Sequence, residues 1–171
     1  LIPNSIGPNT YLITQNSEIP AVLGRIYSES MADGRFTRIV FENGELNKYI
    51  TLNDFLEGIS LTTANGFNNA VNNQFTMYAY KSQGKQSLGW VAKRISGSSQ
   101  NLNQIMSSWE GGLGINAESL GYVLKYNKKG PCVFKSRKYQ TNDLRYCELA
   151  TTPECYGVCY AITKDYLIYG T

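Results

Sequence analysis

The stretch that decides the fold is LNQIMSSW, residues 102–109. Its apolar side chains fall at positions i, i+3, i+4 and i+7, the spacing of one apolar stripe along an α-helix; they are Leu102, Ile105, Met106 and Trp109. Ser98 or Ser99 can cap the start of this helix, and Gly111-Gly112 can end it. Because such a stripe needs a partner surface, we expect the helix to pack on a sheet.

The rest of the chain supplies that sheet, because its apolar pattern mostly has a period of two, which is typical of strands. The predicted strands are Tyr11–Gln15, Ala21–Tyr27, Arg35–Glu42, Leu46–Leu52, Gln74–Lys81, Leu88–Ile95, Leu120–Tyr126, Cys132–Tyr139, Leu144–Leu149, Gly157–Ile162 and Tyr166–Tyr169. Three predicted hairpin turns are Asn43-Gly44, Ser82–Lys85 and Asn127–Gly130, since such residues accept the backbone angles of tight turns.

Between these strands, a shorter helix is predicted over Asn53–Gly58 with Phe55, Leu56 and Ile59 inward, and a long loop over Thr62–Gln74. The expected fold class is therefore α+β, mainly β, with a twisted antiparallel sheet wrapped around one amphipathic helix. A galectin-like β-sandwich is the alternative, because many short strands at this spacing also suit a sandwich.

Length and composition exclude several classes of protein. A chain of 171 residues fits one domain over residues 1–171. The absence of histidine excludes a Ser-His-Asp triad, a Cys-His pair and an HExxH zinc site. A net charge of +3 gives no strong field for nucleic acid, and no apolar run is long enough for membrane insertion. Only 17% of the residues are charged, so amides, hydroxyls and phenols dominate the polar surface.

The four cysteines, Cys132, Cys147, Cys155 and Cys159, do not have the spacing of a zinc site. Free thiols and one or two disulfides both remain open. No cluster of Asp, Asn and Glu has calcium-loop spacing, so no metal or other cofactor is expected. The carboxylates Asp33, Asp54, Glu57, Asp143 and Asp165 are scattered, and a glycosidase pair among them remains an alternative because such pairs meet only in space.

The aromatic residues suggest a binding surface. Alternation places Tyr78 and Tyr80 on the face of their strand opposite Met77. If this strand pairs with Leu88–Ile95, then Trp90 can join the two tyrosines in an exposed shelf with Lys93 or Arg94 at its edge. Flat rings beside hydrogen-bonding groups suit carbohydrate, so Tyr78, Tyr80, Trp90 and Arg94 are the predicted glycan site. Burial of Trp90 in the core is the competing interpretation.

The layout of the chain resembles the glycan-binding head domain of rotavirus spike proteins. The early strands around Tyr11-Leu12-Ile13, Val22–Ile26 and Tyr49–Leu52 follow a similar order, as do the late Lys128-Lys129-Gly130 turn and the late cysteines. The richness in Asn makes the chain most similar to the group B heads, which implies a sheet clasped around a helix. The start at Leu1-Ile2-Pro3 without Met agrees with a domain cut from a longer spike protein.

The resemblance implies a viral attachment domain on the virion surface, in the outer capsid, that is made in the host cytoplasm. Its expected partners are host-cell glycans containing galactose or N-acetyllactosamine and the rest of the spike. The expected binding is weak and independent of calcium, without catalysis. A small carboxylate-dependent glycoside hydrolase and a purely structural capsid or adhesin module are the alternatives.

Overall fold

The computed structural model describes residues 8–28, 36–44, 48–59, 61–83, 85–98, 101–110, 133–148 and 157–170. The strands are β1 (Pro8–Ile13), β2 (Phe36–Asn43), β3 (Lys48–Tyr49), β4 (Val71–Ser82), β5 (Lys85–Arg94), β6 (Lys135–Tyr139), β7 (Asn142–Glu148), β8 (Gly157–Ile162) and β9 (Tyr166–Gly170). The helices are η1 (Asn16–Glu18), α1 (Ile19–Ser28), α2 (Leu52–Gly58), α3 (Phe67–Ala70) and an unlabelled helix over residues 102–110.

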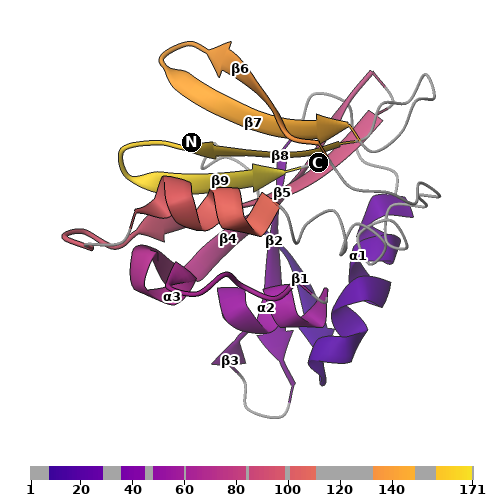
Figure 1. Ribbon diagram of the computed structural model, residues 1–171. Coiled ribbons are helices and arrows are strands. Elements are labelled where there is room, and N and C mark those ends of the chain that lie inside the picture. The colour runs from indigo at the N-terminus through magenta and orange to yellow at the C-terminus, as the bar shows by residue number, and fades with distance from the viewer. Residues whose placement is uncertain are drawn as a thin grey trace.

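The nine strands form one open sheet in the order β1-β2-β4-β5-β9-β8-β7-β6, with β3 beside β2. β1 runs parallel to β2, and all other pairs are antiparallel. The fold is thus mainly β within the α+β class, as predicted, and the described strands belong to a single sheet, unlike those of a sandwich. Figure 1 shows α2, α3 and the helix of residues 102–110 on one side of this sheet.

The predicted amphipathic helix is confirmed, and its stripe is buried. Leu102, Ile105, Met106 and Trp109 are each less than a tenth exposed. The Trp109 ring lies 5.4 Å from that of Phe67 and 6.2 Å from that of Tyr169 on β9, and its indole N–H donates to the Thr62 carbonyl at 3.0 Å. The stripe therefore faces β9 and α3, and it closes the core over the middle of the sheet.

Asn101 caps this helix, in place of the predicted Ser98 or Ser99. Its side-chain oxygen accepts hydrogen bonds from the backbone N–H groups of Asn103 and Gln104 at 3.1 and 3.3 Å. Asn is as good a cap as Ser, and it stands directly before the first helical residue. The predicted end at Gly111-Gly112 lies outside the described residues, as do the strand Leu120–Tyr126 and the turn Asn127–Gly130.

Three other predictions from the sequence are wrong. The predicted strand Ala21–Tyr27 belongs to α1, whose buried residues Ile19, Val22, Leu23 and Ile26 have helical spacing. The predicted strand Leu46–Leu52 contains only the two residues of β3, because Thr51 caps α2 and Leu52 begins it. The predicted loop Thr62–Gln74 contains α3 and the first residues of β4.

The predicted hairpin at Ser82–Lys85 is confirmed. Ser82 pairs with Lys85, and Gln83 has a φ of 51°, in the left-handed region that two-residue hairpin turns require. The chain also reverses between β2 and β3, but Asn43 pairs with Lys48 as the last residue of β2 and is not a central turn residue as predicted. The short helix α2 also agrees with prediction, since Phe55, Leu56 and Ile59 are buried. The Ser82–Lys85 hairpin joins β4 directly to β5 in the register that positions the candidate site.

Candidate functional site

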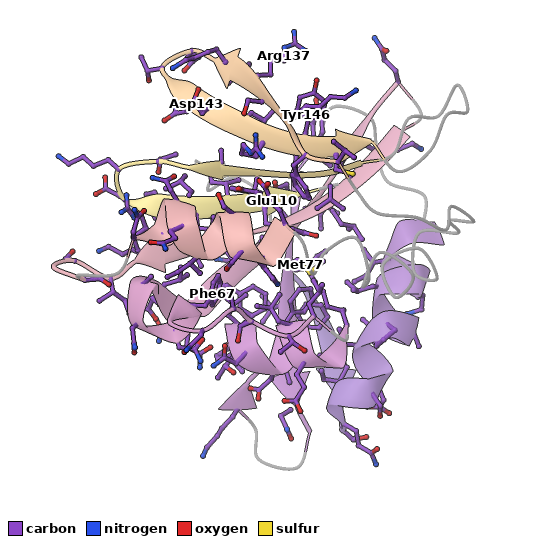
Figure 2. All side chains as sticks on the ribbon, viewed as in Figure 1. Phe67, Met77, Glu110, Arg137, Asp143 and Tyr146 are labelled. Carbon is purple, nitrogen blue, oxygen red and sulfur yellow. The ribbon has the colours of Figure 1, made fainter. Side chains whose placement is uncertain are left out.

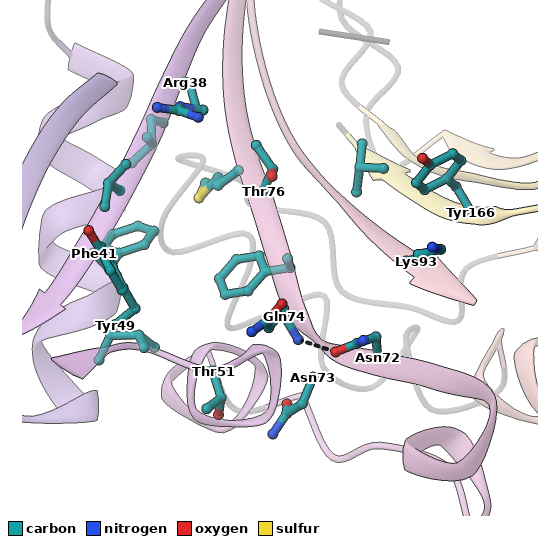
Figure 3. Close-up of a pocket in the computed structure, with 16 residues that line it drawn as sticks. Arg38, Phe41, Tyr49, Thr51, Asn72, Asn73, Gln74, Thr76, Lys93 and Tyr166 are labelled. Carbon is teal, nitrogen blue, oxygen red and sulfur yellow. Dashed lines mark hydrogen bonds between the residues drawn. The ribbon is translucent and has the colours of Figure 1, made fainter. Parts of the chain in front are cut away.

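A groove opens where β2 leaves β4. The two strands pair only from Phe36 to Ile39, which lies opposite Met77. Beyond this point β2 pairs with β3 instead, and a register shift between Val71 and Phe75 bends the first half of β4. The resulting β2–β4 groove has a volume of about 660 Å³ and extends across β5 to β9 (Figure 3). Pockets of this size accept small ligands and short oligomers.

The floor of the groove is apolar. Ile39, Phe41 and Met77 line it and are buried, and Phe75 and Val91 are half-buried. Phe41 packs with its ring 5.9 Å from that of Phe55, and Phe55 in turn lies 5.2 Å from Phe75. The floor is therefore continuous with the core, so it is held rigidly by the packing of α2.

Two tyrosine rings border the groove. Tyr49 on β3 is 71% exposed and Tyr166 on β9 is 37% exposed. Figure 3 shows them at opposite ends of the groove, with β4 and β5 between them. Tyr49 is placed by the capping box that follows it, in which Thr51 accepts from the backbone of Asp54 while Asp54 accepts from the backbone of Thr51. The rings offer flat apolar surfaces to a ligand.

Amide side chains lie between the two rings, on the bent half of β4. Asn72, Asn73 and Gln74 are exposed and line the groove. The Asn72 side-chain oxygen accepts from the Gln74 backbone at 2.9 Å, and that of Asn73 accepts from the Asn53 backbone in α2 at 2.9 Å. These bonds hold the oxygens of Asn72 and Asn73. Within the described part of the chain, their NH2 groups and the Gln74 side-chain amide make no such bond, so these groups can bond a ligand.

The charged residues of the groove are cations. Arg38 on β2 and Lys93 on β5 line it and are exposed. No Asp or Glu occurs among the described residues that line the groove. The described lining thus combines aromatic, amide, hydroxyl and cationic groups. These groups can stack on a polar ligand and hydrogen-bond to it, but the described lining does not contain the pair of carboxylates that glycoside hydrolysis uses.

The predicted aromatic shelf does not form as one surface. β4 and β5 do pair, but Trp90 lies opposite Met77, so its ring is on the helix-covered face. It is 1% exposed and stacks on Tyr169 with ring centres 5.2 Å apart. Tyr78 and Tyr80 point to the other face, as predicted from alternation. Trp90 is therefore a core residue, and the competing interpretation was the correct one.

The two tyrosines of the predicted shelf are only half-buried. Tyr78 lies across Gly89, and its hydroxyl donates to the Tyr169 carbonyl at 3.4 Å. Burial, with a smaller effect of the neighbouring Cys159, raises the pKa of Tyr78 to about 12. The Tyr78 phenol is therefore neutral at physiological pH, and its ring is packed on the sheet. Tyr80 lies on the same face, opposite Ser87.

Arg94 has a structural role instead of lying free at the edge of a shelf. Its Nη1 donates to the carbonyls of Thr163 and Lys164 at 2.9 and 3.2 Å, and its backbone N–H donates to the Asp165 carbonyl at 2.8 Å. It thereby fixes the turn between β8 and β9, and with it Tyr166 at the end of the groove. The Arg94 guanidinium, predicted to bind a ligand, instead donates hydrogen bonds to backbone carbonyls of a turn.

A second polar cluster joins the helix of residues 102–110 to β7 and β8. Arg145 donates to Glu110 twice, at 2.8 and 2.6 Å, and to Ser136 at 2.6 Å, while the Tyr160 hydroxyl donates to Glu110 at 2.6 Å. Figure 2 shows Glu110 at the end of its helix, facing this part of the sheet. Burial would raise the pKa of Glu110, but the bonds from Arg145 and Tyr160 outweigh it and hold the pKa below its ordinary value.

Sequence reasoning missed Glu110, although a signal was present. Glu110 follows Leu102 by two steps of four residues, so it continues the buried stripe of its helix. A carboxylate at such a position needs hydrogen-bond donors or a cation beside it. The other candidate carboxylates do not pair with one another among the described residues. Asp54 accepts from the backbone of Thr51 in the capping box of α2, Asp143 pairs with Lys138 at 3.2 Å, and Glu57 and Asp165 are exposed. Asp33 lies outside the described residues.

Of the four cysteines, two can be described. Cys147 is buried and disulfide-bonded, and its partner lies outside the described residues. Cys159 is free, and burial raises the pKa of its thiol. Within the described part of the chain, no cluster of three or more His, Cys, Asp or Glu could hold a metal ion. Among the described helices, none combines the length and apolar character that crossing a bilayer requires.

Comparisons with known protein families, with curated proteins and with solved structures find no match to this chain. The functional argument therefore depends on the geometry of the β2–β4 groove and on the physical chemistry of its lining.

Proposed function

We propose that this chain is a glycan-binding domain that acts without catalysis, and that the β2–β4 groove is its site. The observation that supports this most is the combination of the exposed Tyr49 and Tyr166 rings with the amides of Asn72, Asn73 and Gln74 in one groove. Sugar C–H groups stack on flat rings, while sugar hydroxyls need donors and acceptors at fixed positions. A tyrosine ring that stays exposed on the sheet in the absence of ligand lowers the stability of the folded protein only slightly.

The proposed ligands are host-cell glycans that contain galactose or N-acetyllactosamine, and the proposed role is viral attachment from the virion surface, as the resemblance to rotavirus spike heads implies. A single site should bind in roughly the millimolar to high-micromolar range. Many spikes on one virion would raise this through multivalency. Removal of calcium by EDTA should leave the binding unchanged.

The test is an NMR titration of ¹⁵N-labelled protein with N-acetyllactosamine. We expect shifts that cluster on Tyr49, Thr51, Asn72–Gln74 and Lys93. Tyr49→Ala should weaken binding by about tenfold, or about 1.4 kcal/mol. Tyr139→Ala is the matched control, since Tyr139 lies on β6 outside the described lining and is 69% exposed against 71% for Tyr49. It should bind as the wild type does.

Other outcomes would reject the proposal in distinct ways. Shifts confined to Tyr78 and Tyr80 would place the site beside the groove, further along the same face of β4. Release of free galactose during the titration would favour a glycoside hydrolase. No detectable binding to a broad array of galactose-containing glycans would favour a structural module.

A further inference from the structure

We infer that the β2–β4 groove takes an oligosaccharide of at least three sugar rings, with one ring stacked on Tyr49 and another on Tyr166. This inference depends on the proposed function, because it specifies the ligand of the same site. It assigns Tyr49 to one end of the ligand and Tyr166 to the other, so that the two tyrosines form separate stacking subsites.

The sheet register sets the distance between the two tyrosines. Tyr49 lies opposite Glu42, three residues past the last β2–β4 pair at Ile39, and Tyr166 lies opposite Lys93, three residues past Trp90, the partner of Met77. The two tyrosines are thus at a similar level along the strands. β4 and β5 lie between them (Figure 3). The paired steps from β4 to β5 and from β5 to β9 account for about 10 Å, and the open groove between β3 and β4, which do not pair, adds to this separation.

One sugar ring cannot cover this distance. A pyranose ring is similar in size to the phenol ring on which it stacks, and neighbouring rings of a glycan share one glycosidic oxygen. Stacking on both tyrosines therefore needs two rings with at least one further sugar between them. A monosaccharide or a disaccharide leaves one tyrosine ring exposed.

The distribution of exposed aromatic rings supports a long ligand. Among the tyrosines whose side chains the structure describes, Tyr49, Tyr139 and Tyr166 are exposed, and Tyr49 and Tyr166 line this groove. Gln74, Thr76 and Lys93 lie between the two rings. Their amide, hydroxyl and ammonium groups can bond the hydroxyls of the sugars that connect the stacked rings.

The two ends of the groove differ in chemistry, which orients the ligand. The Tyr49 end adjoins the amides of Asn73 and Gln74 and the hydroxyl of Thr51 (Figure 3). The Tyr166 end adjoins Lys93, its direct neighbour across β5 and β9. We therefore place the terminal N-acetyllactosamine at the Tyr49 end, where it has the most hydrogen-bonding partners, and the remaining sugars toward Tyr166.

The experiment measures affinity for a series of increasing length: galactose, N-acetyllactosamine and lacto-N-neotetraose, a tetrasaccharide that ends in N-acetyllactosamine. Wild type should bind the tetrasaccharide about tenfold more tightly than the disaccharide. Tyr166→Ala should remove this gain while changing the disaccharide affinity less than about twofold. Tyr49→Ala should weaken both ligands, and Tyr139→Ala should weaken neither.

The outcomes separate this inference from the proposed function. Equal affinity for the disaccharide and the tetrasaccharide, or a Tyr166→Ala variant that weakens both ligands equally, would overturn the inference and leave glycan binding in place. Binding of none of the three saccharides would overturn the proposed function itself. Spectra of the variants without ligand check that each one is folded.

Discussion

Trp90 lies directly opposite Met77 in the antiparallel register of β4 and β5. This relationship places the Trp90 indole on the face that the helices cover, where it stacks on Tyr169. The same register places Tyr78 opposite Gly89 on the other face. This register therefore separates the Trp90 indole from the two phenols with which the sequence analysis grouped it.

Replacement of Trp90 tests this placement directly. Trp90→Ala should lower the free energy of unfolding by about 3–5 kcal/mol, because it leaves a cavity in a packed core. Its affinity for N-acetyllactosamine, measured at a temperature where the variant stays folded, should equal that of wild type. A stable variant that has lost glycan binding would contradict the placement and return Trp90 to the site.

The register also explains which parts of the molecule could be predicted from sequence. Alternation within one strand shows which of its residues share a face, and it correctly placed Tyr78 and Tyr80 on the face opposite Met77. It does not show which face of the next strand they join, because a shift of one residue in pairing reverses every side chain. The Trp90 prediction failed at this step.

The β2–β4 groove could not be predicted from the sequence for a similar reason. Tyr49 and Tyr166 are far apart in sequence, and they share a groove only because β2 leaves β4 after Ile39. Local pattern carries no signal for the end of a pairing between distant strands. The helix of residues 102–110 was predictable because its stripe is local. The β-branched Val22 and Ile26 favoured a strand, but both are buried in the core as residues of α1, because tertiary packing outweighs their intrinsic preference.

Gly89 should resist substitution because the backbone of β9 and the Tyr78 ring both lie against it. A β-carbon at Gly89 would collide with the Tyr169 carbonyl oxygen and with the Tyr78 ring. Gly89→Ala should therefore destabilise the protein by about 1–3 kcal/mol in urea denaturation. Gly24 on α1 is the control, since a β-carbon there meets no atom within 4 Å, and Gly24→Ala should stabilise by about 0.5–1 kcal/mol. Equal effects of the two substitutions would contradict the close packing at Gly89.

The capping box of α2 should contribute to stability beside the groove. Thr51→Ala removes the acceptor for the Asp54 backbone and should cost about 1 kcal/mol. Thr51→Ser keeps the hydroxyl and should cost little. Thermal or urea unfolding of the two variants separates the loss of the cap from the loss of the methyl group. If the two substitutions are equally destabilising, the cap contributes nothing and the methyl group is responsible.

Glu110 should give the protein a stability that depends on pH. Its carboxylate accepts three hydrogen bonds from Arg145 and Tyr160, and bonds to charged groups contribute about 1.5–3 kcal/mol. Glu110→Gln should therefore lower the free energy of unfolding by that amount at pH 7.

The folded state holds the Glu110 pKa below the ordinary value of 4.5. A depressed pKa means that the unfolded state binds the proton first, so the stabilisation is fully present above pH 4.5 and is lost as the pH falls through the folded pKa. The difference in the free energy of unfolding between wild type and Glu110→Gln should therefore be constant from pH 7 to about pH 5 and become smaller below pH 4.5 in urea titrations.

Glu57→Gln, at an exposed position on α2, serves as the control, and its free energy of unfolding should stay within about 0.5 kcal/mol of wild type at pH 7. A Glu110→Gln difference that persists unchanged down to pH 3 would show that the side-chain shape, and not the paired charge, stabilises the contact between the helix and β7.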